Sequence, residues 1–499
     1  MNPPSPEPDR RAVAVVLAAG LGTRMRSRTP KVLHPLCGRP MLAYVLDASR
    51  AATGGPPVVV YSPATSAILE AFAGQAEFVL QDEPRGTGDA VAAALRAVPG
   101  DAGEVLVVSG DVPRVEVETL RDLLEARRLD EAVLSLVAVD AIDPSGLGRV
   151  IRTSAGSVDR IVEEKDADDD ERLVTEINAG LYAFDAGWLR ARIGALRPSA
   201  ATGELYLTEL VGMARSEGRL VTAIEAEDDG RLLGINDRAQ LAQAEWDLRT
   251  ELNLGHMRRG VTMEDPSTVY LDASVELEPD VTLEPNVILR GRTWVGEGSV
   301  IGAGSRIVDS EIGRECRVVS SVIEASRIGD RVTVGPFSHL RAGSVVDPDA
   351  QIGNYAEIKN SHIGPGVKSH HMSYLGDAEL GAGTNVGAGT ITANYDGVRK
   401  HRTTIGERVF LGVDTMLRAP VTIGDGAKTG AGAVVTRDVP PGMLAVGVPA
   451  RIREPRPAVV EVPPGDTPEA GDTPGAATGA APETTGQPDA EAGSTEGGG

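Results

Sequence analysis

Aliphatic residues recur at every sixth position through much of the C-terminal half of this chain. The longest unbroken run comprises Ile328, Val334, Leu340, Val346, Ile352 and Ile358. The same step returns in Val269, Val275, Val281 and Val287, then in Val295, Ile301 and Ile307, and again in Ile405, Leu411, Leu417 and Ile423. Because a helix repeats every 3.6 residues and a strand every 2, a six-residue step predicts a β-helix built from hexapeptides.

In such a fold three hexapeptides make one triangular coil, the aliphatic residue points inward, and glycine or asparagine turns the tight corners. Short strands of an ordinary sandwich are the alternative, but they do not keep one register over six consecutive repeats. The flat outer faces of a solenoid are commonly used for contacts. We therefore expect a homotrimer of parallel prisms, with any site on them in the cleft between neighbouring copies.

Length and charge limit the remaining possibilities. A chain of 499 residues allows about three domains, and a net charge of −23 argues against a basic surface for nucleic acid. Two cysteines, Cys37 and Cys316, predict a reducing cytoplasm and no disulfide framework. No apolar run approaches the roughly 18 residues of a membrane span.

Composition and periodicity divide the chain into five segments. We expect a disordered arm (1–11), an α/β domain (12–237), a helical linker (238–260), the β-helix (261–453) and a disordered acidic tail (454–499). Asp237 is a plausible N-cap of the linker helix.

The α/β domain is predicted from alternating strands and helices. Residues 12–17 form a continuous apolar run, typical of a buried parallel strand. Further strands are expected at 58–61, 77–80, 105–108 and 132–139, and helices at 88–98 and 115–128. This order indicates a Rossmann-like, mostly parallel sheet whose ligands bind at the carboxyl ends of the strands.

A glycine-rich turn follows the first strand. Gly20 and Gly22 allow backbone N–H groups to approach a phosphate closely, and the cations Arg24 and Lys31 come next. A G-x-G pair alone is a weak signal. The third glycine of the dinucleotide fingerprint and the GK[ST] ending of a Walker loop are both missing.

The longer string Leu-Ala-Ala-Gly-x-Gly-Thr-Arg-Met, followed by Pro-Lys, resembles the sugar-1-phosphate nucleotidyltransferases. The resemblance implies that UTP is bound by the backbone of Leu17, Ala18, Ala19 and Gly20 and by Lys31, and that uracil is recognised by Gln81, Gly86 and Thr87. It implies sugar contacts from Gly148, Glu163 and Asn178. Asp111 and Asn236 would hold magnesium, and Asn236 would also contact the nucleotide. Arg24 and Lys31 are then the catalytic cations. Taken singly, Asp111 as a helix cap, Glu163 on a solvated face and Asn236 in a turn are simpler interpretations.

The β-helix carries a second set of polar strings, beginning at His371, Asn385 and Asn394. Residues 393–404 interrupt the six-residue step, which predicts a surface loop. These strings, in this order after such an N-terminal domain, resemble the bacterial bifunctional N-acetylglucosamine-1-phosphate uridyltransferases/glucosamine-1-phosphate acetyltransferases. The resemblance covers roughly residues 12–445.

The resemblance implies that acetyl-CoA acetylates glucosamine-1-phosphate and that UTP then activates the product to UDP-N-acetylglucosamine, a precursor of peptidoglycan and lipopolysaccharide. His371 would be the general base, because an ammonium must lose a proton before it attacks a thioester, and Glu357 would orient its ring. The implied substrate-binding residues are Arg341, Lys359, Tyr374 and Asn385, and the implied acetyl-CoA-binding residues are Ala388, Asn394, Tyr395, Val413 and Ala431. Tyr374, Asn394 and Tyr395 would also line the sugar pocket. The family usually has serine where Val413 stands.

Three alternatives remain open. The β-helix could serve only regulation or oligomerisation in a single-function nucleotidyltransferase. It could be a metal-dependent hydratase whose ligands come from His339, His362, His370 and His371. It could also be a purely structural scaffold, which the polar loops disfavour.

Overall fold

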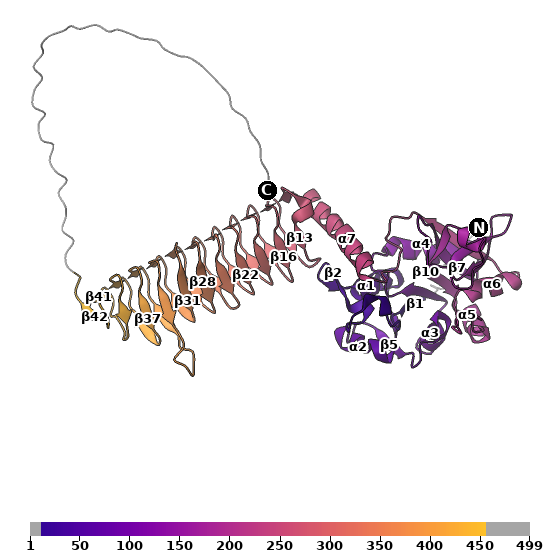
Figure 1. The fold of residues 1–499 in the computed structure, drawn as a ribbon, viewed down its shortest axis with the longest axis horizontal. Helices are drawn as coiled ribbons and strands as arrows, with labels where there is room; N and C mark the ends of the chain where they lie inside the picture. The colour runs from indigo at the N-terminus through magenta and orange to yellow at the C-terminus, as the bar shows by residue number, and fades with distance from the viewer. Residues whose placement is uncertain (1–10, 456–499) are drawn as a thin grey trace, which may run out of the picture. The chain divides into compact units, whose positions relative to one another are not determined.

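The computed structural model describes residues 11–455 (Figure 1). The predicted arm (1–11) and tail (454–499) therefore lie almost wholly outside the described residues.

A nine-stranded mixed sheet forms the centre of the N-terminal part. Its main path runs in the order β11 (Val221–Ala226), β7 (Leu134–Asp140), β10 (Glu176–Asp185), β6 (Glu104–Ser109), β1 (Ala12–Leu17), β4 (Val58–Tyr61) and β5 (Glu77–Leu80). Strands β6, β1, β4 and β5 are parallel, as predicted, whereas β10 runs antiparallel to β6 and β7. The hairpin β8 (Arg149–Arg152) and β9 (Val158–Val162), which the sequence did not reveal, pairs with β10.

Residues of β1 alternate between two hydrophobic clusters. Val13 and Val15 belong to one cluster, and Ala14 and Val16 to the other. A strand covered on both faces reads as a continuous apolar run, which explains the pattern at 12–17. The helices are α1 (Met41–Thr53), α2 (Ala67–Ala71), α3 (Thr87–Ala94), α4 (Val117–Leu129), α5 (Ala186–Arg192) and α6 (Glu209–Ser216).

Helix α7 (Arg238–Arg258) connects the α/β part to the first coil of the β-helix. The carboxylate of Asp237 accepts hydrogen bonds from the backbone of Ala239 and Gln240, which confirms it as the N-cap. Near the other end, Asn253 Nδ2 donates to the carbonyls of Pro266 and Val269 at 2.8 and 3.1 Å. The helix thus supplies donors to backbone acceptors of the first coil.

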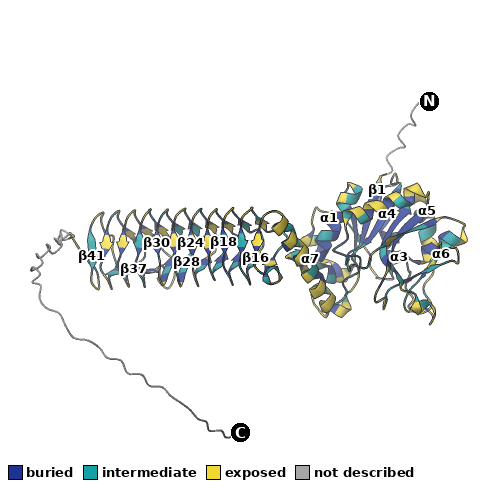
Figure 2. Ribbon diagram, turned by 90° about the horizontal axis from the view of Figure 1, so that it is seen from above, coloured by how far each residue is buried: buried dark blue, intermediate teal, exposed yellow. Residues whose placement is uncertain are grey.

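Beyond α7 the chain forms a left-handed parallel β-helix of stacked coils, as the hexapeptide pattern predicts (Figure 2). Its first coil contains β12 (Thr262–Met263), β13 (Tyr270–Leu271) and β14 (Glu276–Leu277), and its last strands are β41 (Leu444–Val446) and β42 (Arg451–Arg453). Up to the last coil each strand pairs with the strand three positions later, giving three parallel sheets that extend along the coils. The end departs from this rule, because β42 pairs antiparallel with β41. The strand edges are therefore covered by the neighbouring coils rather than by helices.

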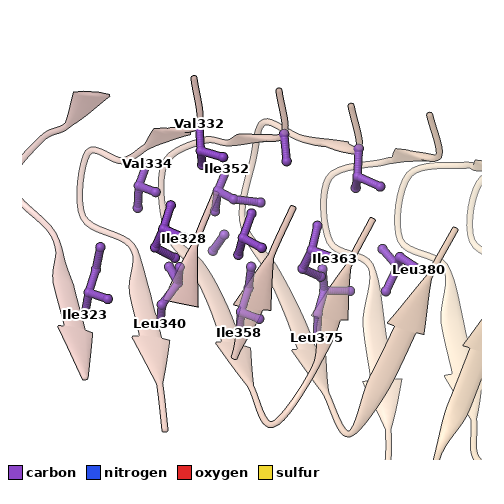
Figure 3. Packing of buried hydrophobic residues seen from close by; sticks show 14 of the residues in the cluster. Ile323, Ile328, Val332, Val334, Leu340, Ile352, Ile358, Ile363, Leu375 and Leu380 are labelled. Carbon is purple, nitrogen blue, oxygen red and sulfur yellow. The ribbon is translucent and has the colours of Figure 1, made fainter. Parts of the chain in front are cut away.

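Aliphatic side chains fill the interior of the coils (Figure 3). Leu340 lies between Ile323 and Ile358 in the ladder of parallel pairs, and all three are fully buried. Complete burial of such a side chain stabilises the fold by about 1.5–3 kcal/mol. Many coils repeat this contact, so the six-residue step in the sequence marks residues that point into the interior.

The register of the first repeats differs in detail from the sequence pattern. Val269 and Val287 are buried, but each lies just before a strand, and the inward residues of those strands are Leu271 and Leu289. In these repeats two positions of each hexapeptide, two residues apart, therefore point inward. The step also shortens to five residues in places, as from Ile307 to Ile312.

The corners hold more residue types than glycine and asparagine. Phe337 and Tyr355 adopt the left-handed conformation, with φ of 60° and 59°, and their exposed rings stack with centroids 5.5 Å apart. Such a conformation is rare for bulky residues and is retained where the surroundings enforce it.

Candidate active sites

The glycine-rich turn and the predicted metal ligands meet at the carboxyl edge of the α/β sheet. Leu17 ends β1 beside the end of β6, and its carbonyl accepts a hydrogen bond from Gly110 N at 2.9 Å. Asp111 follows directly. The Lys31 ammonium donates to Asp111 Oδ2 and, at 3.1 Å, to Asn236 Oδ1. Three residues separated by up to 205 positions in sequence therefore converge on one point.

Backbone contacts fix the turn itself. Ala18 N donates to Val60 O, and Ser62 Oγ donates to Ala19 O, both at 2.9 Å. Gly22 has a φ of 58°, and a Cβ there would lie 2.6 Å from Lys31 Cβ. Glycine is thus required for both its conformation and this close approach.

Arg24 is exposed and makes no hydrogen bond or ion pair with any residue among 11–455. Its guanidinium is therefore available to a ligand bound at the turn.

The residues predicted to read the base form a second group, two strands along the sheet. Gln81 follows β5 and is buried, and its Nε2 donates to Gly86 O at 3.2 Å and to Asp89 Oδ2 at 2.8 Å. Thr87 Oγ1 accepts from Leu207 N at 3.0 Å. With both N–H bonds of its amide used, Gln81 has its oxygen left as an acceptor. Asp89, which no motif in the sequence marks, stands only two residues after Thr87.

The predicted sugar-binding residues form a third group, at the hairpin and β10. Asn178 N donates to Gly148 O at 2.9 Å, and a Cβ on Gly148 would lie 3.4 Å from Glu163 Oε2. Asn178 Nδ2 donates to the Tyr182 hydroxyl at 2.5 Å, across an irregularity in the pairing of β10. Such bulges redirect side chains beside binding sites.

Glu163 is an unusual carboxylate. Burial raises its pKa, and the charges of Asp166 and Glu204 act in the same direction, while a hydrogen bond from Thr208 Oγ1 opposes them. Sequence reasoning missed both Thr208 and Tyr182, because neither belongs to a recognisable string. A desolvated carboxylate with a single hydroxyl partner is suited to accept hydrogen bonds from a ligand.

On the β-helix, three cations gather on one face. Arg341 ends β25 (His339–Arg341) and pairs in register with Lys359 of β28 (Ala356–Lys359). The side chain of Lys400, from the inserted loop, lowers the pKa of Lys359, and Arg341 adds to this effect. A cluster of like charges at a surface indicates an anionic ligand.

Glu357 contacts a different residue from the one expected. Its Oε1 accepts from Arg341 at 2.9 Å, and no hydrogen bond joins it to His371 within residues 11–455. Within one chain Glu357 therefore pairs with Arg341, and its orienting of the His371 ring stays a prediction.

The sugar-pocket residues and the loop are linked through Asp377. Asn394 Nδ2 donates to Asp377 Oδ2 at 2.5 Å and lies 3.5 Å from the Tyr374 hydroxyl. Tyr395, farther out on the loop, is exposed and donates to Gly397 O at 2.6 Å. Asn385 lies on another face, in β33 (Asn385–Val386), so one chain does not bring it together with Tyr374.

His371 lies in a column of stacked corners that also carries three of the predicted acetyl-CoA residues. Gly389 N donates to the carbonyl of Met372, Asp414 N to that of Ala388, and Gly432 N to that of Val413, at 2.7, 2.6 and 2.8 Å. The corners that carry His371, Ala388, Val413 and Ala431 are therefore stacked coil upon coil. His371 is exposed, and the ring of His370 meets it edge-on, with centroids 6.3 Å apart.

The other three histidines considered as metal ligands contact residues of the preceding coil. His339 lies 3.2 Å from Glu324, His362 lies 2.8 Å from Asp347, and His370 Nε2 lies 2.7 Å from Gln351 Oε1. Across residues 11–455, no group of three or more His, Cys, Asp or Glu side chains is placed to hold a metal ion.

No helix within residues 11–455 has the length and apolarity needed to cross a membrane.

Each half of the chain matches a known protein family. Residues 14–162 match the model of the MobA-like NTP transferase domain, and residues 402–437 match the bacterial transferase hexapeptide repeats. Curated relatives named bifunctional protein GlmU include one from Pelobacter propionicus, 46% identical over 87% of this chain and 95% of its own length. Those from Heliobacterium modesticaldum and Mycolicibacterium vanbaalenii are 44% and 42% identical, over 94% and 90% of their lengths. This chain belongs to the family of bifunctional GlmU proteins.

Proposed function

We propose that this protein makes UDP-N-acetylglucosamine in two steps, one in each half. The β-helix transfers an acetyl group from acetyl-CoA to the amine of glucosamine-1-phosphate. The α/β domain then transfers a uridylyl group from UTP to N-acetylglucosamine-1-phosphate and releases pyrophosphate. The observation that carries the proposal is the convergence of Lys31, Asp111 and Asn236 beside the glycine-rich turn, together with an exposed His371 in the column of stacked corners of the same chain.

In the uridylyl step a phosphate oxygen of the sugar-1-phosphate attacks the α-phosphorus of UTP, and the bond from that phosphorus to the β-phosphate oxygen breaks. The attacking phosphate is already ionised near neutral pH, so no base is needed. Both partners are anions, and positive charge must offset their repulsion. Arg24 and Lys31 would stabilise the charge that develops on the triphosphate.

Magnesium is a reasonable partner of this site. A carboxylate oxygen of Asp111 and an amide oxygen of Asn236 already converge on a cation, the Lys31 ammonium. Hard oxygen donors suit Mg²⁺, which usually takes one or two carboxylates and completes its shell with water and phosphate. Asp111 and Asn236 would hold the ion, whose chemistry is to neutralise phosphate charge and fix the geometry of attack.

In the acetyl step His371 would remove a proton from the substrate ammonium. The free amine then attacks the thioester carbonyl, the C–S bond breaks, and coenzyme A leaves as a thiolate that takes up a proton. Arg341, Lys359 and Lys400 would bind the sugar phosphate. Tyr374 and Asn394 would line the sugar pocket, and the corners at Ala388, Val413 and Ala431 would contact acetyl-CoA.

We also propose a homotrimer in the cytoplasm. Hexapeptide-repeat proteins use their flat faces for assembly. The stacked, exposed rings of Phe337 and Tyr355, in coils shortly before His371, offer apolar surface for a neighbouring copy. Cys37 and Cys316 are free thiols, which fits a reducing compartment. Sedimentation of the wild-type protein and of a Phe337→Asp, Tyr355→Asp variant tests the assembly.

The function is tested by incubating the protein with glucosamine-1-phosphate, acetyl-CoA, UTP and magnesium, and following coenzyme A and pyrophosphate separately. Pyrophosphate release should require acetyl-CoA when glucosamine-1-phosphate is supplied, and should not require it when N-acetylglucosamine-1-phosphate is supplied. Pyrophosphate without coenzyme A under every condition would leave only a single-function nucleotidyltransferase.

A further inference from the structure

The Lys31 side chain touches the same two oxygens that would hold the divalent cation. Its ammonium lies against Asp111 Oδ2 and 3.1 Å from Asn236 Oδ1. Resting on the proposed function, we infer that Lys31 and a divalent cation compete for these two oxygens. A bound triphosphate relieves the competition by offering the ammonium another anion.

The acceptor oxygens are fixed, so the cation is the part that exchanges. Asn236 Nδ2 donates to Gly234 O at 2.9 Å, which leaves Oδ1 facing Lys31. Asn236 N donates to Gln240 Oε1 at 2.7 Å, and Ile235 N donates to Asp111 O at 2.9 Å. These bonds hold the loop of Asn236 against Asp111.

Burial makes it unfavourable for the Lys31 ammonium and a divalent cation to occupy these two oxygens at the same time. The side chains of Lys31 and Asp111 are 12% and 20% exposed, so charges at this site are less screened than at a fully exposed surface. A divalent ion between Asp111 and Asn236 would sit within contact distance of the ammonium. The repulsion between the two cations favours departure of one of them.

Lys31 also has an alternative place to bind. Its Cβ packs closely against Gly22, since a Cβ added to Gly22 would lie 2.6 Å from Lys31 Cβ. The stem of the side chain therefore starts beside the turn proposed to cradle the phosphates, and its ammonium can rotate toward them without the backbone moving. Metal affinity and triphosphate affinity are then coupled through Lys31, and such coupling is reciprocal.

The test uses the full-length protein with Mn²⁺ as the probe, titrated without nucleotide and followed by the paramagnetic resonance signal of the free ion. Lys31→Met keeps the apolar stem and removes the charge. We expect it to bind Mn²⁺ about tenfold more tightly than the wild type, within the range of typical site-to-site coupling. Lys31→Arg keeps the charge and should bind like the wild type, as should Lys165→Met, which removes an exposed lysine of the same domain.

Two further measurements complete the comparison. Adding Asp111→Asn to Lys31→Met should abolish the gain, which assigns the bound ion to this site. In the presence of EDTA, calorimetry should show UTP binding weakened about tenfold by Lys31→Met and unchanged by Lys165→Met. Equal thermal unfolding temperatures show that the variants are folded.

Equal Mn²⁺ affinity of Lys31→Met and the wild type, including undetectable binding in both, overturns the competition. A gain that survives Asp111→Asn overturns it as well. The two transferase reactions are assayed on the wild-type protein separately, so their absence would overturn the proposed function without deciding whether Lys31 and the cation compete.

Discussion

The hydroxyl of Thr208 donates a hydrogen bond to Glu163 Oε1 at 3.0 Å, in a pocket where burial raises the pKa of that carboxyl. A glutamate in water titrates near pH 4.3. Because the folded-state pKa lies above that value, Glu163 takes up its proton at a higher pH than an exposed glutamate as the solution is acidified. If the ionised form binds the sugar, its affinity is lost over the same range.

Thr208→Val removes the hydrogen bond that favours the ionised form, so it should raise the pKa of Glu163 further. The acid limb of kcat/KM for N-acetylglucosamine-1-phosphate should then move to higher pH, while acetyl transfer keeps its profile. Uridylyl transfer measured from pH 5 to 8 checks this. Profiles that superimpose would show that Glu163 does not control sugar binding.

Arg24→Ala should lower uridylyl turnover by about 10²–10³-fold, as the loss of one transition-state donor typically does. The unfolding midpoint should not change, because Arg24 is exposed and unpaired among residues 11–455. Arg28→Ala, which removes another exposed arginine four residues later, is the matched control and should change turnover only a few-fold. Near-normal turnover in Arg24→Ala would remove this residue from the proposed role.

His371→Ala should abolish detectable acetyl transfer and leave uridylyl transfer from N-acetylglucosamine-1-phosphate intact, since the two reactions use different halves of the chain. General-base removal typically costs 10²–10⁴-fold. His370→Ala is the control, because His370 flanks His371 at the same corner and its ring already contacts Gln351. If His370→Ala loses the activity and His371→Ala keeps it, the assignment of the base is reversed.

Leu340→Ala should destabilise the β-helix by about 2–5 kcal/mol, the usual cost of a cavity in a packed core. Leu340 is fully buried between Ile323 and Ile358, so its truncation leaves a cavity that the neighbouring coils fill only in part. Val398→Ala, at a position that is 81% exposed, should cost almost nothing. Guanidinium unfolding followed by circular dichroism measures both, and equal midpoints would contradict the packing described for the coils.

The amino-acid sequence determined the architecture, because each coil repeats one local rule. Aliphatic residues such as Leu340 and Ile358 point into the interior of their own coil, so residues at a fixed step in sequence occupy equivalent positions in successive coils. The strand at 12–17 could also be predicted from the sequence, since burial on both faces requires a continuous apolar run. The resemblance also supplied the site residues, because strings such as those around Lys31 and His371 are contiguous in sequence.

Tertiary structure alone decided how these residues meet. Lys31, Asp111 and Asn236 lie on separate segments, and only the sheet edge brings their charges together. Thr208 reaches Glu163 from a position 45 residues later, and no periodicity marks it. Glu357 pairs with Arg341 rather than His371 because parallel strands bring Arg341 within its reach. Local sequence patterns indicate whether a side chain is buried, whereas its contacts with residues distant in sequence depend on how those segments pack.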